Sequence, residues 1–208
     1  MNELTLDNAL LRRQAILDSQ QELVGYDLSL VTPNDCGQHT ALQERARAAA
    51  LVCAAYAELG IRSALGNSTA FLHTDPVFLH DDAIEALPPD GVVLELVLDT
   101  PPDARMLERC RALRERRYAL ALADYNGLDA CSRPLLTLVD VVKIDIRTHD
   151  DAALRELAGP LARLPLKLLA YGVDTPADFA RCQALGFQLF QGDHFAHAET
   201  VSGRRLTP

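Results

Sequence analysis

The residues best suited to chemistry in this sequence are polar side chains that stand inside or directly after short apolar stretches. Lys143 is the clearest case, because a lysine within a buried strand is rarely tolerated unless it is paired or points into an opening. The others are Asp27, His73, Glu95, Asp124 and Gln191. Carboxylates that converge beside a lysine suit a phosphoesterase centre, with Mg²⁺ or Mn²⁺ on oxygen ligands and a cation near the attacking water. Each residue taken singly is more simply a solvated strand end.

The elements that would position these residues alternate between strand and helix. Residues 12–17 and 22–31 are expected to form two strands, and the short turn between them makes the pair antiparallel. Further strands are expected at 70–73, 92–98, 118–123, 140–145, 166–171 and 187–190. Helices are expected at 41–59, 81–87, 101–117, 134–138, 150–164 and 176–185. Such alternation is typical of parallel strands joined by right-handed crossovers.

The number of strands favours a closed barrel over an open sheet. When the N-terminal pair is included, the count approaches eight, which predicts an α/β barrel with an antiparallel first strand. An open doubly wound sheet is the alternative, but its glycine-rich phosphate loop is missing from the sequence.

The composition indicates one ordinary domain and argues against nucleic acid and anionic membranes as partners. The 208 residues are 49% hydrophobic and carry a net charge of −9, which disfavours nonspecific binding to nucleic acid or to an anionic membrane. We expect no membrane insertion and no signal peptide. The five cysteines are scattered and contain no CxxC pair, which predicts reduced thiols in a cytoplasmic protein. Residues 1–200 are expected to form the barrel domain, and residues 201–208 a tail or the start of a linker.

Seven short motifs, spread over nearly the whole chain, carry a resemblance to a known family. They are RQAILD at 13–18, VGYDL at 24–28, LEL at 94–96, ALADY at 121–125, VKID at 142–145, LAYGVDT at 169–175 and LGFQLFQG at 185–192. In this order they resemble an EAL domain, the domain of bacterial cyclic di-GMP phosphodiesterases, and most closely the N-terminal EAL-like domain of EAL–HDOD proteins. The resemblance implies a modified TIM (β/α)8 barrel with its pocket at the C-terminal ends of the strands. It also implies that an HDOD domain could follow this barrel.

The resemblance further implies which residues correspond to the site of active members. Four are kept, namely Glu95, Asp124, Lys143 and Gln191. Five positions differ from those of active members. Asp27 stands in place of the signature Glu, His73 in place of an Asn, and Ala123 in place of the first of two adjacent Asp residues. Tyr171 stands in place of a Glu, and Val31 in place of an Arg that contacts the dinucleotide. A two-metal centre needs carboxylates to offset about four positive charges. The losses at Ala123 and Tyr171 therefore predict that no Mg²⁺ or Mn²⁺ is held.

These departures predict a degenerate phosphodiesterase with no functional catalytic residue and no cofactor. The vestigial pocket would consist of Asp27, His73, Glu95, Asp124, Lys143, Tyr171 and Gln191. The protein would then be a regulatory or protein-interaction module in bacterial cyclic di-GMP signal transduction, with a protein partner of unknown identity or a second copy of itself in a homodimer. Two alternatives stay open: a weak cyclic di-GMP phosphodiesterase with an unusual Mg²⁺ or Mn²⁺ set, and a receptor that binds the dinucleotide without hydrolysing it.

Overall fold

The computed structural model describes residues 10–31, 68–74, 76–98, 100–127 and 133–201 of the chain. The strands are β1 (Leu10–Asp18), β2 (Leu23–Val31), β3 (Thr69–Thr74), β4 (Val92–Leu96), β5 (Ala119–Leu122), β6 (Val141–Asp145), β7 (Lys167–Tyr171), β8 (Leu189–Gln191) and β9 (Glu199–Val201). The α-helices are α3 (Pro76–Leu79), α4 (Ala104–Glu115), α5 (Arg133–Leu136), α6 (Asp151–Leu161) and α7 (Pro176–Ala184). Two 3-10 helices are η2 (Asp82–Ala86) and η3 (Ile146–Thr148). The helix expected at 41–59 and the tail at 202–208 lie outside the described residues.

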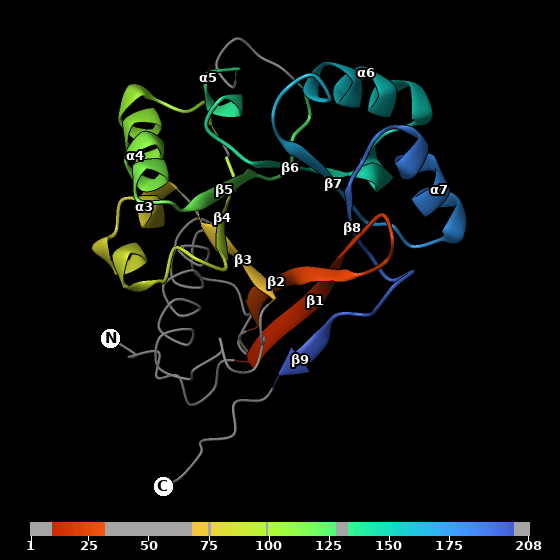
Figure 1. Ribbon diagram of the computed structural model, residues 1–208, viewed down its shortest axis with the longest axis horizontal. Helices are drawn as coiled ribbons and strands as arrows, with labels where there is room; N and C mark the ends of the chain where they lie inside the picture. The colour runs from red at the N-terminus through yellow and green to blue at the C-terminus, as the bar shows by residue number, and fades with distance from the viewer. Residues whose placement is uncertain (1–9, 32–67, 75, 99, 128–132, 202–208) are drawn as a thin grey trace, which may run out of the picture.

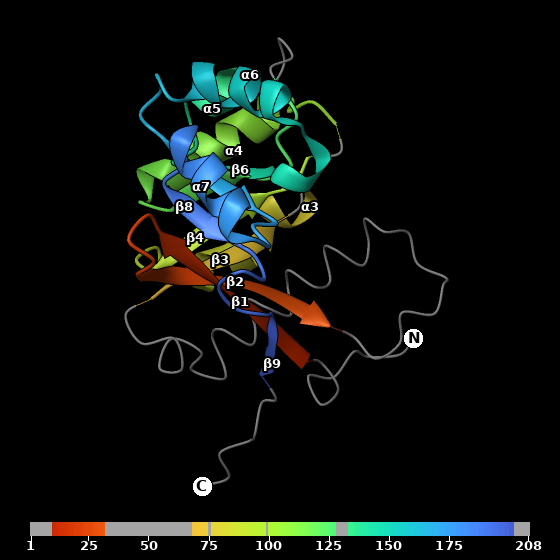
Figure 2. The same cartoon turned by 90° about the vertical axis from the view of Figure 1, so that its right-hand side faces the viewer.

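Strands β1 to β8 close into a barrel, as predicted. Strands β2 to β8 are parallel neighbours in sequence order, and β1 closes the ring by pairing antiparallel with both β2 and β8. Both views show helices α4 to α7 arching around one side of the barrel, while β1, β2 and β9 form the other side of the described structure (Figure 1, Figure 2). The α/β barrel with an antiparallel first strand is therefore confirmed.

The antiparallel pair begins at a tight turn that its own side chains stabilise. Asp18 accepts hydrogen bonds from the backbone N–H groups of Gln20 and Glu22, each at 2.9 Å, and Gln21 has a positive φ of 63°. The ladder that follows places Gln14 opposite Asp27 and Arg12 opposite Ser29. This register brings polar residues of β1 beside polar residues of β2.

Strand β9 was not expected from the sequence. It pairs antiparallel with the N-terminal half of β1, placing Glu199 opposite Arg13, whereas β8 pairs with the other end of β1. The predicted boundary between barrel and tail at residue 200 thus falls inside a strand. Its three residues give too little periodicity to predict a strand from sequence.

Two apolar layers build the core. One lies inside the barrel and consists of Ile16, Phe71, Val93, Ala121, Val141, Leu169 and Leu189. The larger one lies between the strands and the helices, with Leu94, Leu120, Ile144 and Cys110 among its buried members. Because side chains alternate along a strand, the residue two positions beyond an interior residue also faces inward. Along β3, β4, β6, β7 and β8 those residues are His73, Glu95, Lys143, Tyr171 and Gln191.

Side chains cap the starts of α4 and α7, the first later than expected from the sequence and the second at the expected residue. Helix α4 begins at Ala104, not residue 101, since the Asp103 carboxylate accepts a hydrogen bond from the Met106 N–H at 2.7 Å. Helix α7 begins with a capping box between Thr175 and Asp178. No helix of the described residues is long and apolar enough to cross a membrane.

Candidate functional site

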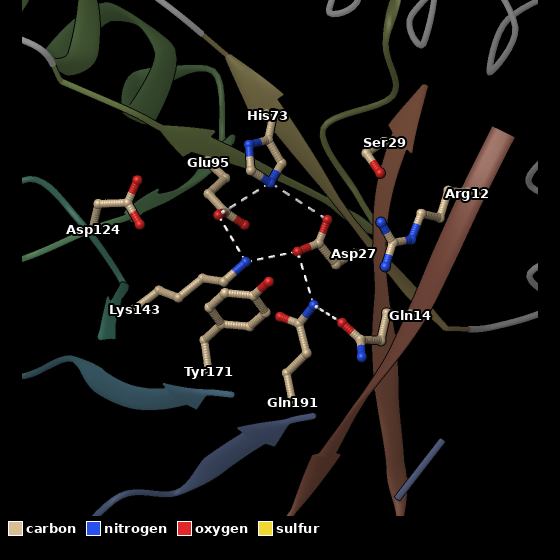
Figure 3. A pocket seen from close by; sticks show the side chains of 10 residues that line it. All are labelled: Arg12, Gln14, Asp27, Ser29, His73, Glu95, Asp124, Lys143, Tyr171 and Gln191. Atoms are coloured by element: carbon tan, nitrogen blue, oxygen red, sulfur yellow. Dashed lines mark hydrogen bonds and ion pairs between the residues drawn. The ribbon is translucent and has the colours of Figure 1, made fainter. Parts of the chain in front are cut away.

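A cavity of about 290 Å³ opens where the parallel strands end. Figure 3 shows the ten side chains that line it: Arg12, Gln14, Asp27, Ser29, His73, Glu95, Asp124, Lys143, Tyr171 and Gln191. The structure therefore brings together all seven residues that the sequence analysis assigned to one pocket. Arg12, Gln14 and Ser29 were missed, although side chains alternate along a strand and residues 22–31 were expected to form one, which puts Ser29 on the same face as Asp27.

Lys143 stands at the centre of the cavity between two carboxylates. Its Nζ donates to Asp27 Oδ2 at 2.6 Å and to Glu95 Oε1 at 2.9 Å. All three side chains are buried, with exposed fractions of 7%, 10% and 0%. Burial lowers the pKa of Lys143, but the attraction of Asp27 and Glu95 is stronger and holds this pKa above its ordinary value. The ammonium therefore stays charged and joins strands β2, β4 and β6.

Asp27 is the most heavily paired acid of the site. Burial raises the pKa of Asp27, but Lys143 and His73 outweigh this effect and hold the pKa well below its ordinary value. Gln191 Nε2 also donates to Asp27 Oδ2 at 3.0 Å and to Gln14 Oε1 at 2.9 Å. This chain of contacts connects β2, β8 and β1 through side chains that could otherwise reach a ligand.

His73 adds a second positive charge at the edge of the cluster. Its Nε2 lies 3.5 Å from Asp27 Oδ1 and 3.4 Å from Glu95 Oε1, while the side chain remains 47% exposed. The Glu95 charge, opposed by burial and supported by Asp27, raises the pKa of His73 to about 9. At neutral pH two carboxylates therefore face two cations.

Tyr171 forms the wall beside Lys143. Its ring lies between two cations, with Lys143 Nζ 5.0 Å and Arg147 Cζ 4.7 Å from the ring centroid. Arg147 is itself fixed by two hydrogen bonds to Asp145, at 2.9 and 2.7 Å. Gly172 follows with φ +79°, and a Cβ there would lie 2.6 Å from Arg147 Nε, so the glycine permits this arrangement. The aromatic ring occupies a position where the resemblance implied a carboxylate.

Asp124 lies apart from the cluster. It follows β5 with a positive φ of 52°, is exposed, and has no hydrogen bond or ion pair with any residue in the described ranges. Ala123, which precedes it, is buried and offers no ligand atom. Of the two acids that the sequence suggested as partners of Lys143, Glu95 is one and Asp124 is not, and Asp27 is a second partner.

Three of these residues could hold a single metal ion. Asp27, His73 and Glu95 each place one ligand atom so that all lie within 4.8 Å of one another. Glu95 Oε2 is buried and has no hydrogen-bond partner among the described residues. The ligand set mixes one imidazole with two carboxylates, which suits a transition metal better than Mg²⁺.

Residues 67–198 match the EAL domain family, and the chain belongs to this family. It is 25% identical over 199 residues to the uncharacterized protein YuxH of Bacillus subtilis, covering 94% of this chain and 48% of the relative. It is 29% identical over 211 residues to the cyclic di-GMP phosphodiesterase CdgJ of Vibrio cholerae, covering 98% and 48%. The chain thus spans about half the length of these curated relatives. The resemblance to an EAL domain found in the sequence is confirmed.

A solved structure gives the same fold. The calcium and cyclic di-GMP complex of Klebsiella pneumoniae BlrP1 superposes with a TM-score of 0.73 at 20% identity, over 96% of this chain and 58% of that one. At this level of identity the likeness concerns the barrel, not the chemistry of the pocket.

The first prediction concerns the central ion pairs. Lys143→Met should lower the free energy of unfolding by about 3–5 kcal/mol, because it leaves Asp27 and Glu95 buried without their ammonium. Lys167→Met is the matched control, since Lys167 is exposed at the start of β7, and it should change stability by less than about 0.5 kcal/mol. Urea denaturation measures both. Equal effects of the two substitutions would contradict a stabilising role for Lys143.

The second prediction concerns the pH dependence of stability. The pKa of His73 is about 9 in the folded chain and near its ordinary value when unfolded, so protonation favours folding. This contribution is complete below about pH 6.5 and is lost as the pH rises through about 9. The stability difference between the parent and His73→Gln should therefore shrink from pH 6 to pH 10, as followed by urea denaturation. A His73 resonance that titrates near 6.5 in NMR spectra would refute the raised pKa.

Proposed function

We propose that this chain is a catalytically inactive EAL domain that serves as a regulatory or protein-interaction module in bacterial cyclic di-GMP signalling. Membership of the family supplies the signalling context. The observation that carries the inactivity is that Ala123 and Tyr171 offer a methyl group and an aromatic ring where the resemblance implies metal-binding carboxylates. The two acids that remain at the centre of the cavity, Asp27 and Glu95, are in addition paired with the Lys143 ammonium.

The charge balance of the cavity supports this proposal. Two metal ions about 3.5–4 Å apart bring four positive charges and need bridging or surrounding carboxylates. Asp27 and Glu95 are balanced by Lys143 and His73, and Asp124 is the one further carboxylate in the cavity lining. Ala123 and Tyr171 contribute no charge. These residues do not fit a two-metal centre, so we derive no hydrolytic step.

A second candidate is a weak phosphodiesterase or a receptor that depends on a single ion. Its support is the unpaired, buried Glu95 Oε2 beside Asp27 and His73. The relative CdgJ is named a cyclic di-GMP phosphodiesterase, but this chain spans 48% of it. Against the candidate stands the need to displace Lys143 from two short hydrogen bonds before an ion could use the same oxygens.

The third prediction is that the chain neither binds nor hydrolyses cyclic di-GMP, which distinguishes the inactive module from the second candidate. Calorimetric titration with and without Mn²⁺ or Mg²⁺, together with chromatography of the nucleotide, should show neither binding in the micromolar range nor turnover. The expected reason is that no metal neutralises the phosphates within the cavity. An active EAL domain serves as the positive control. Metal-dependent hydrolysis would refute the proposal, and binding without hydrolysis would establish the receptor instead.

The fourth prediction is that restored carboxylates restore metal binding. Ala123→Asp and Tyr171→Glu, combined with Asp27→Glu and His73→Asn, should give a chain that melts lower than the parent without metal. Carboxylates that converge without a counter-ion repel one another, and an ion that binds only the folded state then stabilises it. Mn²⁺ should therefore raise the melting temperature of the revertant and leave the parent unchanged.

The control for this experiment adds the same acids elsewhere. Ala152→Asp with Ala162→Glu introduces two exposed carboxylates on and after α6, at positions that do not line the cavity. This variant should show no Mn²⁺-dependent shift. A folded revertant that behaves like the control would mean that the cavity is not a site that lost its metal ligands.

A further inference from the structure

Arg12 and Ser29 line the cavity without belonging to the Lys143 cluster. They are directly opposite each other in the β1–β2 ladder, two residues along each strand from Gln14 and Asp27. Arg12, Gln14 and Ile16 share one face of β1, and Ile16 is part of the apolar layer inside the barrel. Figure 3 shows the Arg12 guanidinium directed from β1 toward the cavity, close to Ser29.

Arg13, the next residue of β1, differs from Arg12 because its side chain has contacts within the protein. Arg13 points to the other face of β1, where it bonds to Glu199 at 2.9 Å and lies over the Tyr26 ring at 4.9 Å. The Arg12 backbone belongs to the β1 ladders, but its side chain has no hydrogen bond or ion pair with any residue of the part of the chain that the structure describes. Its five N–H donors are thus available to a molecule in the cavity.

The acids of the cavity do not compete for Arg12. Asp27 and Glu95 share the Lys143 ammonium, and Asp27 additionally accepts from Gln191. Asp124, the remaining carboxylate, lies on the opposite side of the cavity from Arg12 in Figure 3. The side formed by β1 and β2 therefore presents a positive charge and a hydroxyl group. Asp193 lies near this side, where it accepts from Gln14 Nε2 at 3.3 Å and lies 3.3 Å from His197 Nδ1, and it makes no ion pair with Arg12.

We infer that Arg12 and Ser29 form a metal-independent subsite for the phosphate group of a small phosphate ester. The planar guanidinium fork donates two parallel hydrogen bonds to two oxygens of a phosphate. The Ser29 hydroxyl, on the next strand, supplies a third donor from another direction, which suits a tetrahedral group better than a planar carboxylate. The cavity of about 290 Å³ is at the small end of ligand pockets, about 300–1,000 Å³, and so matches a mononucleotide-sized ligand.

This inference rests on the proposed function in one respect: the carboxylates of Asp27 and Glu95 pair with Lys143 and not with a metal ion. The probe is guanosine 5′-monophosphate, with inorganic phosphate and guanosine as comparison ligands, titrated calorimetrically in the presence of a chelator. The monophosphate should bind the parent, inorganic phosphate more weakly, and guanosine not at all. Arg12→Gln should weaken binding about tenfold or more, because it removes a charge-assisted bidentate contact.

Arg13→Gln is the matched control, and it should leave the affinity for the monophosphate within about twofold of the parent. Ser29→Ala should weaken binding less than Arg12→Gln does. Thermal melting establishes that each variant is folded, which is expected because Arg12 is exposed. Equal losses in the Arg12 and Arg13 variants would overturn the subsite, as would no binding of the monophosphate to the parent at about 10 mM.

The outcomes also separate this subsite from the proposed function. Metal-dependent hydrolysis of cyclic di-GMP would refute the inactive module, while chelator-resistant, Arg12-dependent binding of the monophosphate would still establish the subsite. A parent that neither hydrolyses the dinucleotide nor binds the monophosphate would leave the inactive module standing and refute the subsite.

Discussion

The contact on which the mouth of this barrel depends is the buried ammonium of Lys143 between Asp27 and Glu95. An isolated ammonium or carboxylate at these positions would be strongly destabilised by the loss of its hydration, so each group requires the others. The three side chains come from β2, β4 and β6, which are not adjacent strands in the barrel. Their mutual pairing therefore fixes the distances across the barrel mouth, and Gln191, His73 and the Tyr171 ring pack around it.

The same geometry explains why polar residues gather at one end of an otherwise apolar barrel. Interior positions alternate along each strand, and the first interior layer is filled by residues such as Phe71, Val93 and Leu189. The next inward positions on those strands are His73, Glu95 and Gln191. They lie where the strands end, so Glu95 and Gln191 bond to other polar side chains of the barrel mouth while His73 also reaches water. The site thus forms because inward-facing positions recur every second residue and the last of them on each strand lies at the barrel mouth.

Much of this arrangement could be predicted from sequence, and the rest depends on register. Lys143 within a β-branched stretch already indicated a partner or an opening, and the strand–helix alternation with its number of strands already favoured a barrel over an open sheet. The choice between Asp27 and Asp124 as its partner could not be read from sequence, because Asp124 leaves the strand with a positive φ and turns away. Arg12 was missed for a related reason. Its position over the cavity follows from the cross-strand register with Ser29, which a sequence does not display.

The origin of the positive charge decides how such a cavity can behave. A metal ion comes from solution, so the occupancy of a metal site depends on ion concentration and on the ligands that share the ion. The Lys143 ammonium is covalently part of β6 and is present in every folded molecule, with its pKa held above the ordinary value. A cavity whose carboxylates are neutralised by a side chain of the same protein therefore has the same charge balance in every folded molecule. A ligand of the cavity would therefore be recognised by lining side chains that do not belong to the Lys143 cluster. Among the described ones, the Arg12 guanidinium is a hydrogen-bond donor that also carries a positive charge.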